Sequence, residues 1–151
     1  MKEKIESLLS KINGKHVWDD QPVFCFNSDI DWASEDVMTE YFNIVNPLEI
    51  KPTLFVTHES AVIEANFQAG KIERGIHPNF LSNSSHGDSF KEIIETVRQF
   101  APESYGFRSH RLFDVTDITH MLKNDYGYQY VSNLGTILQT NIKPILHESG
   151  L

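Results

Sequence analysis

The chain has 151 residues, of which 40% are hydrophobic and 23% charged, and this balance predicts one globular domain over residues 1–151 with a sizeable core. The formal net charge of −8 argues against binding to nucleic acid, because a protein that binds the phosphate backbone needs a basic face. No stretch approaches the ~18 consecutive apolar residues of a membrane span, and the N-terminus lacks the apolar region of a signal peptide, so we expect a soluble, cytoplasmic protein.

Helical and extended patterns alternate along the chain, beginning with an amphipathic helical pattern over residues 1–13. The predicted strands are residues 23–27, 52–57, 72–77, 104–108 and 129–131, and the predicted helices that follow the first four strands are residues 34–46, 60–68, 89–100 and 116–123. This alternation predicts an α/β fold with a parallel sheet built from βα units. The single cysteine, Cys25, lies inside the first predicted strand, where we expect a buried and inert thiol.

In parallel α/β folds, functional groups gather at the carboxyl ends of the strands. The ionisable residues that follow the predicted strands are Asp29, Asp31, His58, His77 and Arg108. The first two are one residue apart, so an extended backbone places both carboxylates on the same side. Two like charges held that close need a shared proton or a bound cation to offset their repulsion. The alternative is an Asp-rich turn in which the carboxylates bond to their own backbone.

Asp31, His77 and His86 together would make a mixed nitrogen and oxygen site suited to a divalent metal such as zinc. Three protein ligands leave a position open for water and substrate, and the metal would lower the pKa of that water. Asp29 lies beside the proposed ligands and is placed to act as the general base. The alternatives are that His86 is a solvent-exposed loop histidine and that His77 only ends a strand. His110 shows no ligand spacing.

Other side chains could support such a site. Arg108 could orient Asp29 through an ion pair or contact an anionic group of a substrate, and the alternative is a surface arginine. Trp32 and Phe80 could offer stacking surfaces for a sugar ring, although single aromatic residues more often belong to the core. His58 follows the second predicted strand, but its context also fits a turn into the next helix, and we favour that structural role.

Five segments of the chain form an ordered series of motifs: residues 26–32 (FNSDIDW), 51–57 (KPTLFVT), 73–77 (ERGIH), 106–109 (GFRS) and 126–133 (YGYQYVSN). In the same order, they resemble motifs of the NodB-homology polysaccharide deacetylases, which are metal-dependent carbohydrate esterases with a distorted, incomplete βα barrel. The resemblance covers about residues 21–134. It is strongest to a divergent, WbmS-like branch that is found with lipopolysaccharide O-antigen biosynthesis. It implies a barrel of the polysaccharide deacetylase type for this chain.

The resemblance also implies residue roles and a reaction. Asp29 corresponds to the family's catalytic base, Asp31 to its metal-binding aspartate, and Arg108 to the arginine that steadies the base. The implied cofactor is a divalent metal, for which we expect zinc. The implied reaction is the hydrolytic removal of an acetyl group from a sugar of a surface polysaccharide or its precursor, and the implied partner is that acetylated sugar.

The metal histidines of the family are less regular in this chain. The motif that leads to the first one ends at His77, but the second usually follows four residues later, where this chain has Leu81. That ligand has either moved to His86 or been lost. The family continues for several more βα units, and its general-acid histidine comes from a late strand. We therefore expect a barrel that is incomplete at its C-terminus, with slow or absent turnover, because His147 is a poor match for that acid.

Two other interpretations stay open. A non-catalytic domain could keep the fold and bind a sugar or serve as an assembly subunit, and a homo-oligomer is compatible with this or with an enzyme. A doubly wound α/β protein of the response-regulator type also places acidic residues after its first strand. It would bind magnesium through Asp29 and Asp31 and would need a lysine after its last strand, for which Lys143 is a weak candidate.

Overall fold

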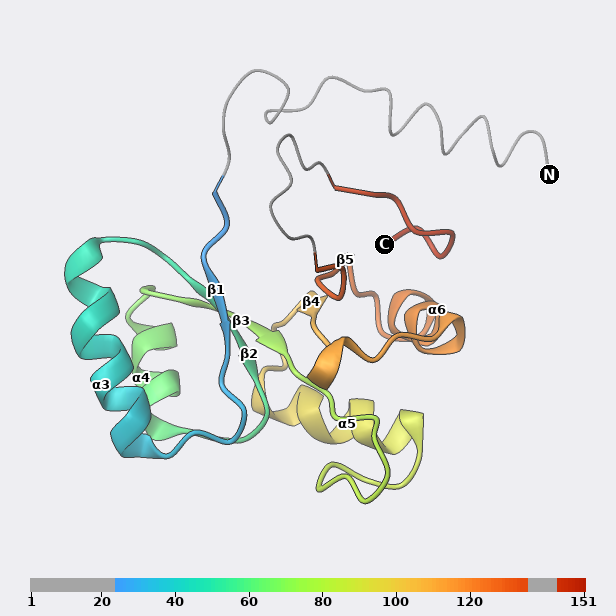
Figure 1. Cartoon of the computed structure of the whole chain (residues 1–151), viewed down its shortest axis with the longest axis horizontal. Coiled ribbons are helices and arrows are strands. Elements are labelled where there is room, and N and C mark those ends of the chain that lie inside the picture. The colour runs from blue at the N-terminus through green and yellow to red at the C-terminus, as the bar shows by residue number, and fades with distance from the viewer. Residues whose placement is uncertain (1–23, 136–143) are drawn as a thin grey trace.

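The structure is a computed structural model that describes residues 24–135 and 144–151 (Figure 1). The predicted helix over residues 1–13 and the candidate Lys143 lie outside the described residues. Within the described ranges, strands and helices alternate in the order that the sequence predicts. No helix in these ranges is both long enough and apolar enough to cross a membrane.

The strands of the described residues form one five-stranded sheet in the order β1-β2-β3-β4-β5. They are β1 (Asn27–Asp29), β2 (Thr53–Val56), β3 (Glu73–Ile76), β4 (Gly106–Phe107) and β5 (Tyr130–Val131). Each strand pairs in parallel with the next one along the sequence. This sequential order is that of a βα barrel, whereas a fold of the response-regulator type inserts its first strand between the second and third. The predicted α/β barrel class is therefore confirmed, and the doubly wound alternative is wrong.

Four α-helices of the described residues connect the strands. They are α3 (Glu35–Val45), α4 (Ala61–Gln68), α5 (Phe90–Phe100) and α6 (Thr116–Asn124), and two short 3-10 helices are η1 (Asn46–Leu48) and η2 (His110–Leu112). The α-helices lie around the sheet in an arc from α3 and α4 through α5 to α6, so that sheet and helices form half of a barrel (Figure 1). Ser34, Ser60 and Ser89 cap the first three, because each hydroxyl accepts a backbone N–H of the first helical turn.

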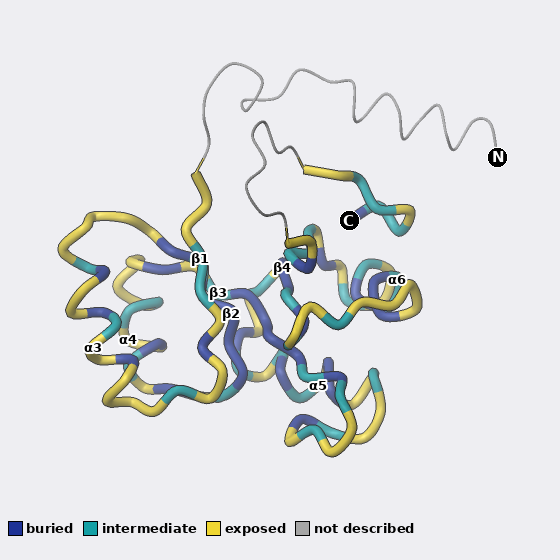
Figure 2. The backbone as a smooth tube through the Cα atoms, viewed as in Figure 1, coloured by how far each residue is buried: buried dark blue, intermediate teal, exposed yellow. Residues whose placement is uncertain are grey.

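The core lies between the central strands and the helices, and Figure 2 shows its backbone in dark blue along β2 and β3. These strands have a neighbour on each side, and parallel strands of this kind are buried on both faces. The side chains with an exposed fraction of at most 1% include Leu54, Phe55, Val56, Ile76, Ile94, Val97, Phe107, Ile118 and Leu122. The residues that follow the carboxyl ends of these strands are therefore attached to a closely packed core.

The first strand differs from the prediction. β1 begins at Asn27, where pairing with β2 begins, and the preceding Phe24 and Phe26 are 94% and 48% exposed. Because β1 lies at the edge of the described sheet, it has one neighbouring strand and little packing is available to the residues before it. Cys25 is exposed, so the prediction of a buried thiol is wrong.

Candidate metal centre

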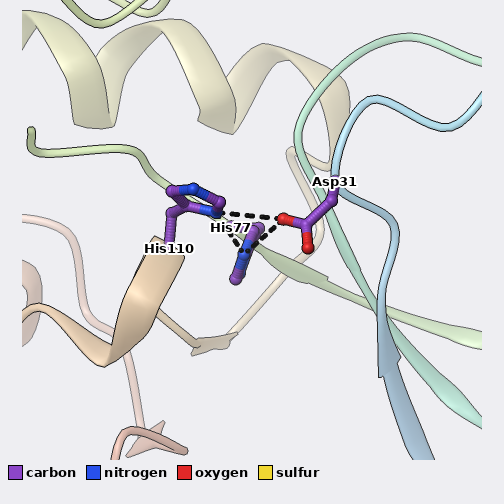
Figure 3. Close-up of side chains that lie close together, drawn as sticks. All are labelled: Asp31, His77 and His110. Carbon is purple, nitrogen blue, oxygen red and sulfur yellow. Dashed lines mark hydrogen bonds and ion pairs between the residues drawn. The ribbon is translucent and has the colours of Figure 1, made fainter.

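Three side chains from different strand ends meet above the sheet (Figure 3). Asp31 lies two residues beyond β1, His77 directly follows β3, and His110 opens the short helix η2 after β4. The Oδ1 atom of Asp31 lies 3.0 Å from Nδ1 of His110 and 3.3 Å from Nε2 of His77. The two imidazole nitrogens are 3.4 Å apart. The three ligand atoms therefore form a nearly equilateral triangle.

The dimensions of this triangle fit a divalent metal ion. A tetrahedral ion with nitrogen and oxygen ligands at about 2.0–2.2 Å holds those atoms about 3.3–3.6 Å apart. The observed separations of 3.3 and 3.4 Å fall in this range, and the third, 3.0 Å, is slightly below it. One carboxylate and two imidazoles are a common donor set for zinc, and three protein ligands leave a position open. Among the described residues, this is the one group of three such side chains with ligand atoms this close.

His77 is held with one nitrogen directed into the triangle. Its Nδ1 lies 2.7 Å from the carbonyl oxygen of Arg108, so Nδ1–H donates to that carbonyl and Nε2 keeps its lone pair. Burial lowers the pKa of His77, although the nearby Asp29 and Asp31 carboxylates act in the opposite direction. The neutral imidazole is the form that binds a metal, so burial favours the ligand state, while the hydrogen bond fixes the tautomer that leaves Nε2 free.

His110 is the residue that the sequence did not suggest. Its backbone N–H donates to the carbonyl of Pro78, which ties η2 to the segment after β3. Its side chain then reaches Asp31 from the opposite side to β1 (Figure 3). One signal was available: His110 follows Arg108 by two residues, the same spacing that separates Asp29 from Asp31. Each member of the second pair contacts the corresponding member of the first, since Arg108 contacts Asp29 and His110 contacts Asp31.

The structure does not bring His86 into the triangle. Its Nε2 donates to the carbonyl of Thr57 at 2.8 Å, and its Nδ1 accepts the backbone N–H of Asn79 at 3.1 Å. Both ring nitrogens are therefore used by the backbone, and the ring is only 4% exposed. Burial lowers the pKa of His86, which keeps the imidazole neutral in this arrangement. The alternative of a solvent-exposed loop histidine is wrong.

Arg108 lies beside Asp29, as the ion-pair hypothesis requires. Its Nη1 donates to Oδ1 of Asp29 at 2.9 Å. The other guanidinium nitrogens donate to Oδ1 of Asn27 and to the hydroxyl and carbonyl of Ser132, at 2.7, 2.7 and 3.0 Å. The guanidinium also lies 4.6 Å from the centre of the Phe55 ring. This arginine is thus a fixed part of the site, and the surface alternative is wrong.

The turn that carries Asp31 has an unusual backbone. Asp31 and Trp32 have φ angles of 39° and 58°, and the N–H of Ala33 donates to the carbonyl of Ile30 at 2.7 Å. Two successive left-handed residues are typical of a type I′ turn, which favours glycine, asparagine and aspartate. A tryptophan in this conformation costs about 1–3 kcal/mol and persists only where its surroundings hold it.

The two candidate stacking aromatics differ in their environments. Trp32 is 39% exposed beside the triangle, with its ring 5.4 Å from the His86 ring and 5.3 Å from the His110 ring. Phe80 is 7% exposed and packs against Phe90 and Phe113, so it belongs to the core. Only Trp32 of this pair therefore remains available to a ligand at the site.

Comparison with known proteins agrees with this fold. The family model of the WbmS-like polysaccharide deacetylases matches residues 26–150, and the chain belongs to this family. Among solved structures, a crystal structure from Bordetella bronchiseptica is similar, with a TM-score of 0.69 and 28% identity over 78% of this chain. The description of that protein proposes a polysaccharide deacetylase involved in O-antigen biosynthesis, and the match spans 49% of its length. No curated protein matches the chain.

Proposed function

We propose that this chain hydrolyses an acetyl group on a sugar of a surface polysaccharide or its precursor, at a divalent metal held by Asp31, His77 and His110. The observation that carries the proposal is the triangle of ligand atoms with sides of 3.0–3.4 Å. Membership of the polysaccharide deacetylase family supports the reaction class. His110 takes the ligand position that the sequence suggested for His86, because His86 has no free nitrogen.

The metal and the residues around it divide the chemistry. A bound zinc ion supplies a Lewis acid that lowers the pKa of water and polarises the acetyl carbonyl. Asp29 acts as the general base, taking the proton from the attacking water through its carboxylate. Arg108 fixes the Asp29 carboxylate at 2.9 Å and offsets the repulsion between the two aspartates. The exposed face of Trp32 beside the site offers an aromatic surface to a sugar ring.

A second candidate is a domain that binds metal and sugar without turnover. His147 is the weak candidate for a general acid. Its Nδ1 lies 2.9 Å from the hydroxyl of Ser149, and its ring packs against His120 of α6. Within the described ranges, no histidine beyond His77 and His110 contributes an atom to the triangle. Among the described residues, the contacts of His147 are with Ser149 and with His120 of α6 and not with the triangle, which favours the non-catalytic candidate.

Metal analysis of four proteins tests the ligand set. We expect wild type and His86→Gln to retain about one zinc per chain after dialysis, because the glutamine keeps a donor and an acceptor outside the triangle. His77→Ala and His110→Ala should each lose most of the metal. Full zinc occupancy in His110→Ala would show that the proposed ligand set is wrong.

Acetate release separates the two functions. The zinc-loaded chain is incubated with O-acetylated and N-acetylated sugars and with oligosaccharides, and acetate is measured over time. The enzyme hypothesis predicts release by wild type and none by Asp29→Asn, with equal zinc content in both proteins. Stoichiometric zinc without acetate from any of these compounds would favour the binding domain.

A further inference from the structure

We propose that Thr57 and His58 are positioning residues for Asp31. Together they form a clamp, here called the Thr57–His58 clamp, on the left-handed Asp31–Trp32 turn, and the clamp aims the Asp31 carboxylate at the two histidines. The inference rests on the proposed metal site and adds to it the residues that fix one of its ligands. Both clamp residues directly follow β2, the strand that pairs with β1.

The clamp is a chain of three hydrogen bonds that runs from Trp32 through Thr57 and His58 to Ala33. The backbone N–H of Trp32 donates to Oγ1 of Thr57 at 3.0 Å. Since that hydroxyl accepts from the backbone, its own hydrogen is available to Nδ1 of His58, which lies 3.0 Å away. Nε2 of His58 then carries the proton and donates to the carbonyl of Ala33 at 3.1 Å. Thr57 and His58 therefore bind the two ends of one peptide segment, Thr57 at the N–H of Trp32 and His58 at the carbonyl of Ala33.

The clamp acts at the position where the turn needs support. It binds the N–H of Trp32 and the carbonyl of Ala33, which lie on either side of the strained tryptophan. The turn's own hydrogen bond joins Ala33 to Ile30 and leaves these two groups for other partners. Asp31 immediately precedes the clamped segment, so rotation of the turn would swing its carboxylate away from His77 and His110.

Thr57 of the clamp is in turn held by His86. Thr57 is 1% exposed, and its carbonyl accepts the Nε2–H of His86 at 2.8 Å. The His86 ring in turn stacks on the Trp32 ring, with centres 5.4 Å apart. A closed loop of contacts thus runs from His86 through Thr57 to Trp32 and back to His86. This gives His86 a place in the architecture of the metal site without a bond to the metal.

The clamp variant Thr57→Val removes the hydroxyl and keeps the shape of the side chain, and Thr57→Ser restores the hydroxyl. The readouts are the Co²⁺ dissociation constant and the visible spectrum of bound Co²⁺, which reports the ligand geometry. We expect Thr57→Val to bind Co²⁺ about 10–100-fold more weakly with an altered spectrum, as for other groups that orient a ligand. Thr57→Ser should restore both readouts.

Two further variants complete the experiment. His58→Ala removes the other half of the clamp and should weaken Co²⁺ binding in the same direction, which keeps the test decisive if Thr57→Val does not fold. Thr119→Val is the matched control, because Thr119 is a fully buried threonine in α6 whose hydroxyl donates to the carbonyl of Thr116. It should leave Co²⁺ affinity and spectrum unchanged.

The outcomes separate the clamp from the metal site. Wild-type protein that binds no Co²⁺ or Zn²⁺ would overturn the proposed site and the clamp with it. Wild-type binding with an unchanged affinity and spectrum in Thr57→Val and His58→Ala would overturn the clamp alone. An equal loss of folding stability in Thr57→Val and Thr119→Val, with metal binding weakened only in the former, would support positioning over a general structural role.

Discussion

The guanidinium of Arg108 donates to the carboxylate of Asp29 at 2.9 Å, although β4 and β1 are separated by two strands. Adjacent strands lie about 4.8 Å apart, so in a flat sheet these strands would be about 14 Å from each other. The contact therefore depends on the inward curl of the half-barrel. Curvature of the sheet therefore brings the ends of distant strands together in one site.

Replacement of Arg108 by lysine tests whether the site requires the several N–H donors of a planar guanidinium. A lysine ammonium cannot donate to Asp29, Asn27 and Ser132 in one geometry, so we expect Asp29 to lose its fixed orientation. If the chain is a deacetylase, kcat should fall about 10–100-fold, as expected when a catalytic group is misplaced by about 1 Å. Zinc content should be unchanged, which distinguishes a displaced base from a lost ligand.

Metal removal should lower stability, because the stabilisation by a bound metal grows with the logarithm of the free metal concentration. A ligand that binds only the folded state at about 100 times its dissociation constant adds about 2.7 kcal/mol to the free energy of unfolding. We expect zinc to raise the melting temperature of the wild-type chain and a chelator to reverse the change. In His110→Ala the two melting curves should coincide. A zinc-dependent shift of wild-type size in that variant would contradict the ligand assignment.

Acid should destabilise the fold through His86. The neutral His86 ring accepts the backbone N–H of Asn79 at Nδ1. A proton added to Nδ1 would remove that acceptor and place two N–H groups against each other. Because the pKa of His86 is lowered from 6.5 in the folded state, the unfolded chain binds the proton more readily. The stabilisation is complete above pH 6.5 and decreases as the pH falls from 6.5 towards the lowered folded value.

This prediction is checked by urea unfolding in the presence of a chelator, at neutral pH and at about pH 5. Wild type should lose more unfolding free energy between the two conditions than His86→Gln, whose amide makes similar hydrogen bonds and does not titrate. An identical pH dependence in both proteins would show that His86 contributes no such linkage.

Gly75 of β3 leaves space for an aromatic ring that packs next to the site. A Cβ at Gly75 would lie 2.5 Å from Cδ1 of Phe55, the ring on which the Arg108 guanidinium rests. Gly75→Ala should therefore displace Phe55 and destabilise the fold by about 1–3 kcal/mol, the range of overpacked cores. At Gly135 the nearest atom to an added Cβ is Cδ1 of Leu112 at 3.7 Å, an ordinary contact. Gly135→Ala serves as the control in chemical denaturation and should change little.

The parts of the fold that could be predicted depend on local patterns. The serine caps and the alternation of apolar runs with helical spacing predict the succession of strands and helices along the chain, including α3 to α6. Asp31 and His77 follow strands directly, so the rule for parallel sheets brings them together. The predicted first strand begins before the observed one, because the apolar run starts outside the region that pairs with β2. The sequence does not show where that pairing begins.

The histidines of the site could not be assigned from spacing alone. His110 points to the triangle because η2 turns back at Arg111 and Leu112, both with φ of 56°, and no periodic pattern marks that turn. His86 lies in a polar loop that folds inward, so that its ring bonds to the backbone of Thr57 and Asn79. Both outcomes depend on tertiary contacts between loops, and these have no signature in a single sequence.

The left-handed Trp32 has a consequence for engineering. Glycine is the residue that a stability-driven redesign would select at this position, because it adopts a positive φ without a steric penalty. That exchange would relax the backbone while removing the aromatic wall that rests on His86 and His110. Under the proposed function, position 32 is thus a place where thermostability and sugar binding select different amino acids, and a redesign for stability would remove the proposed stacking surface.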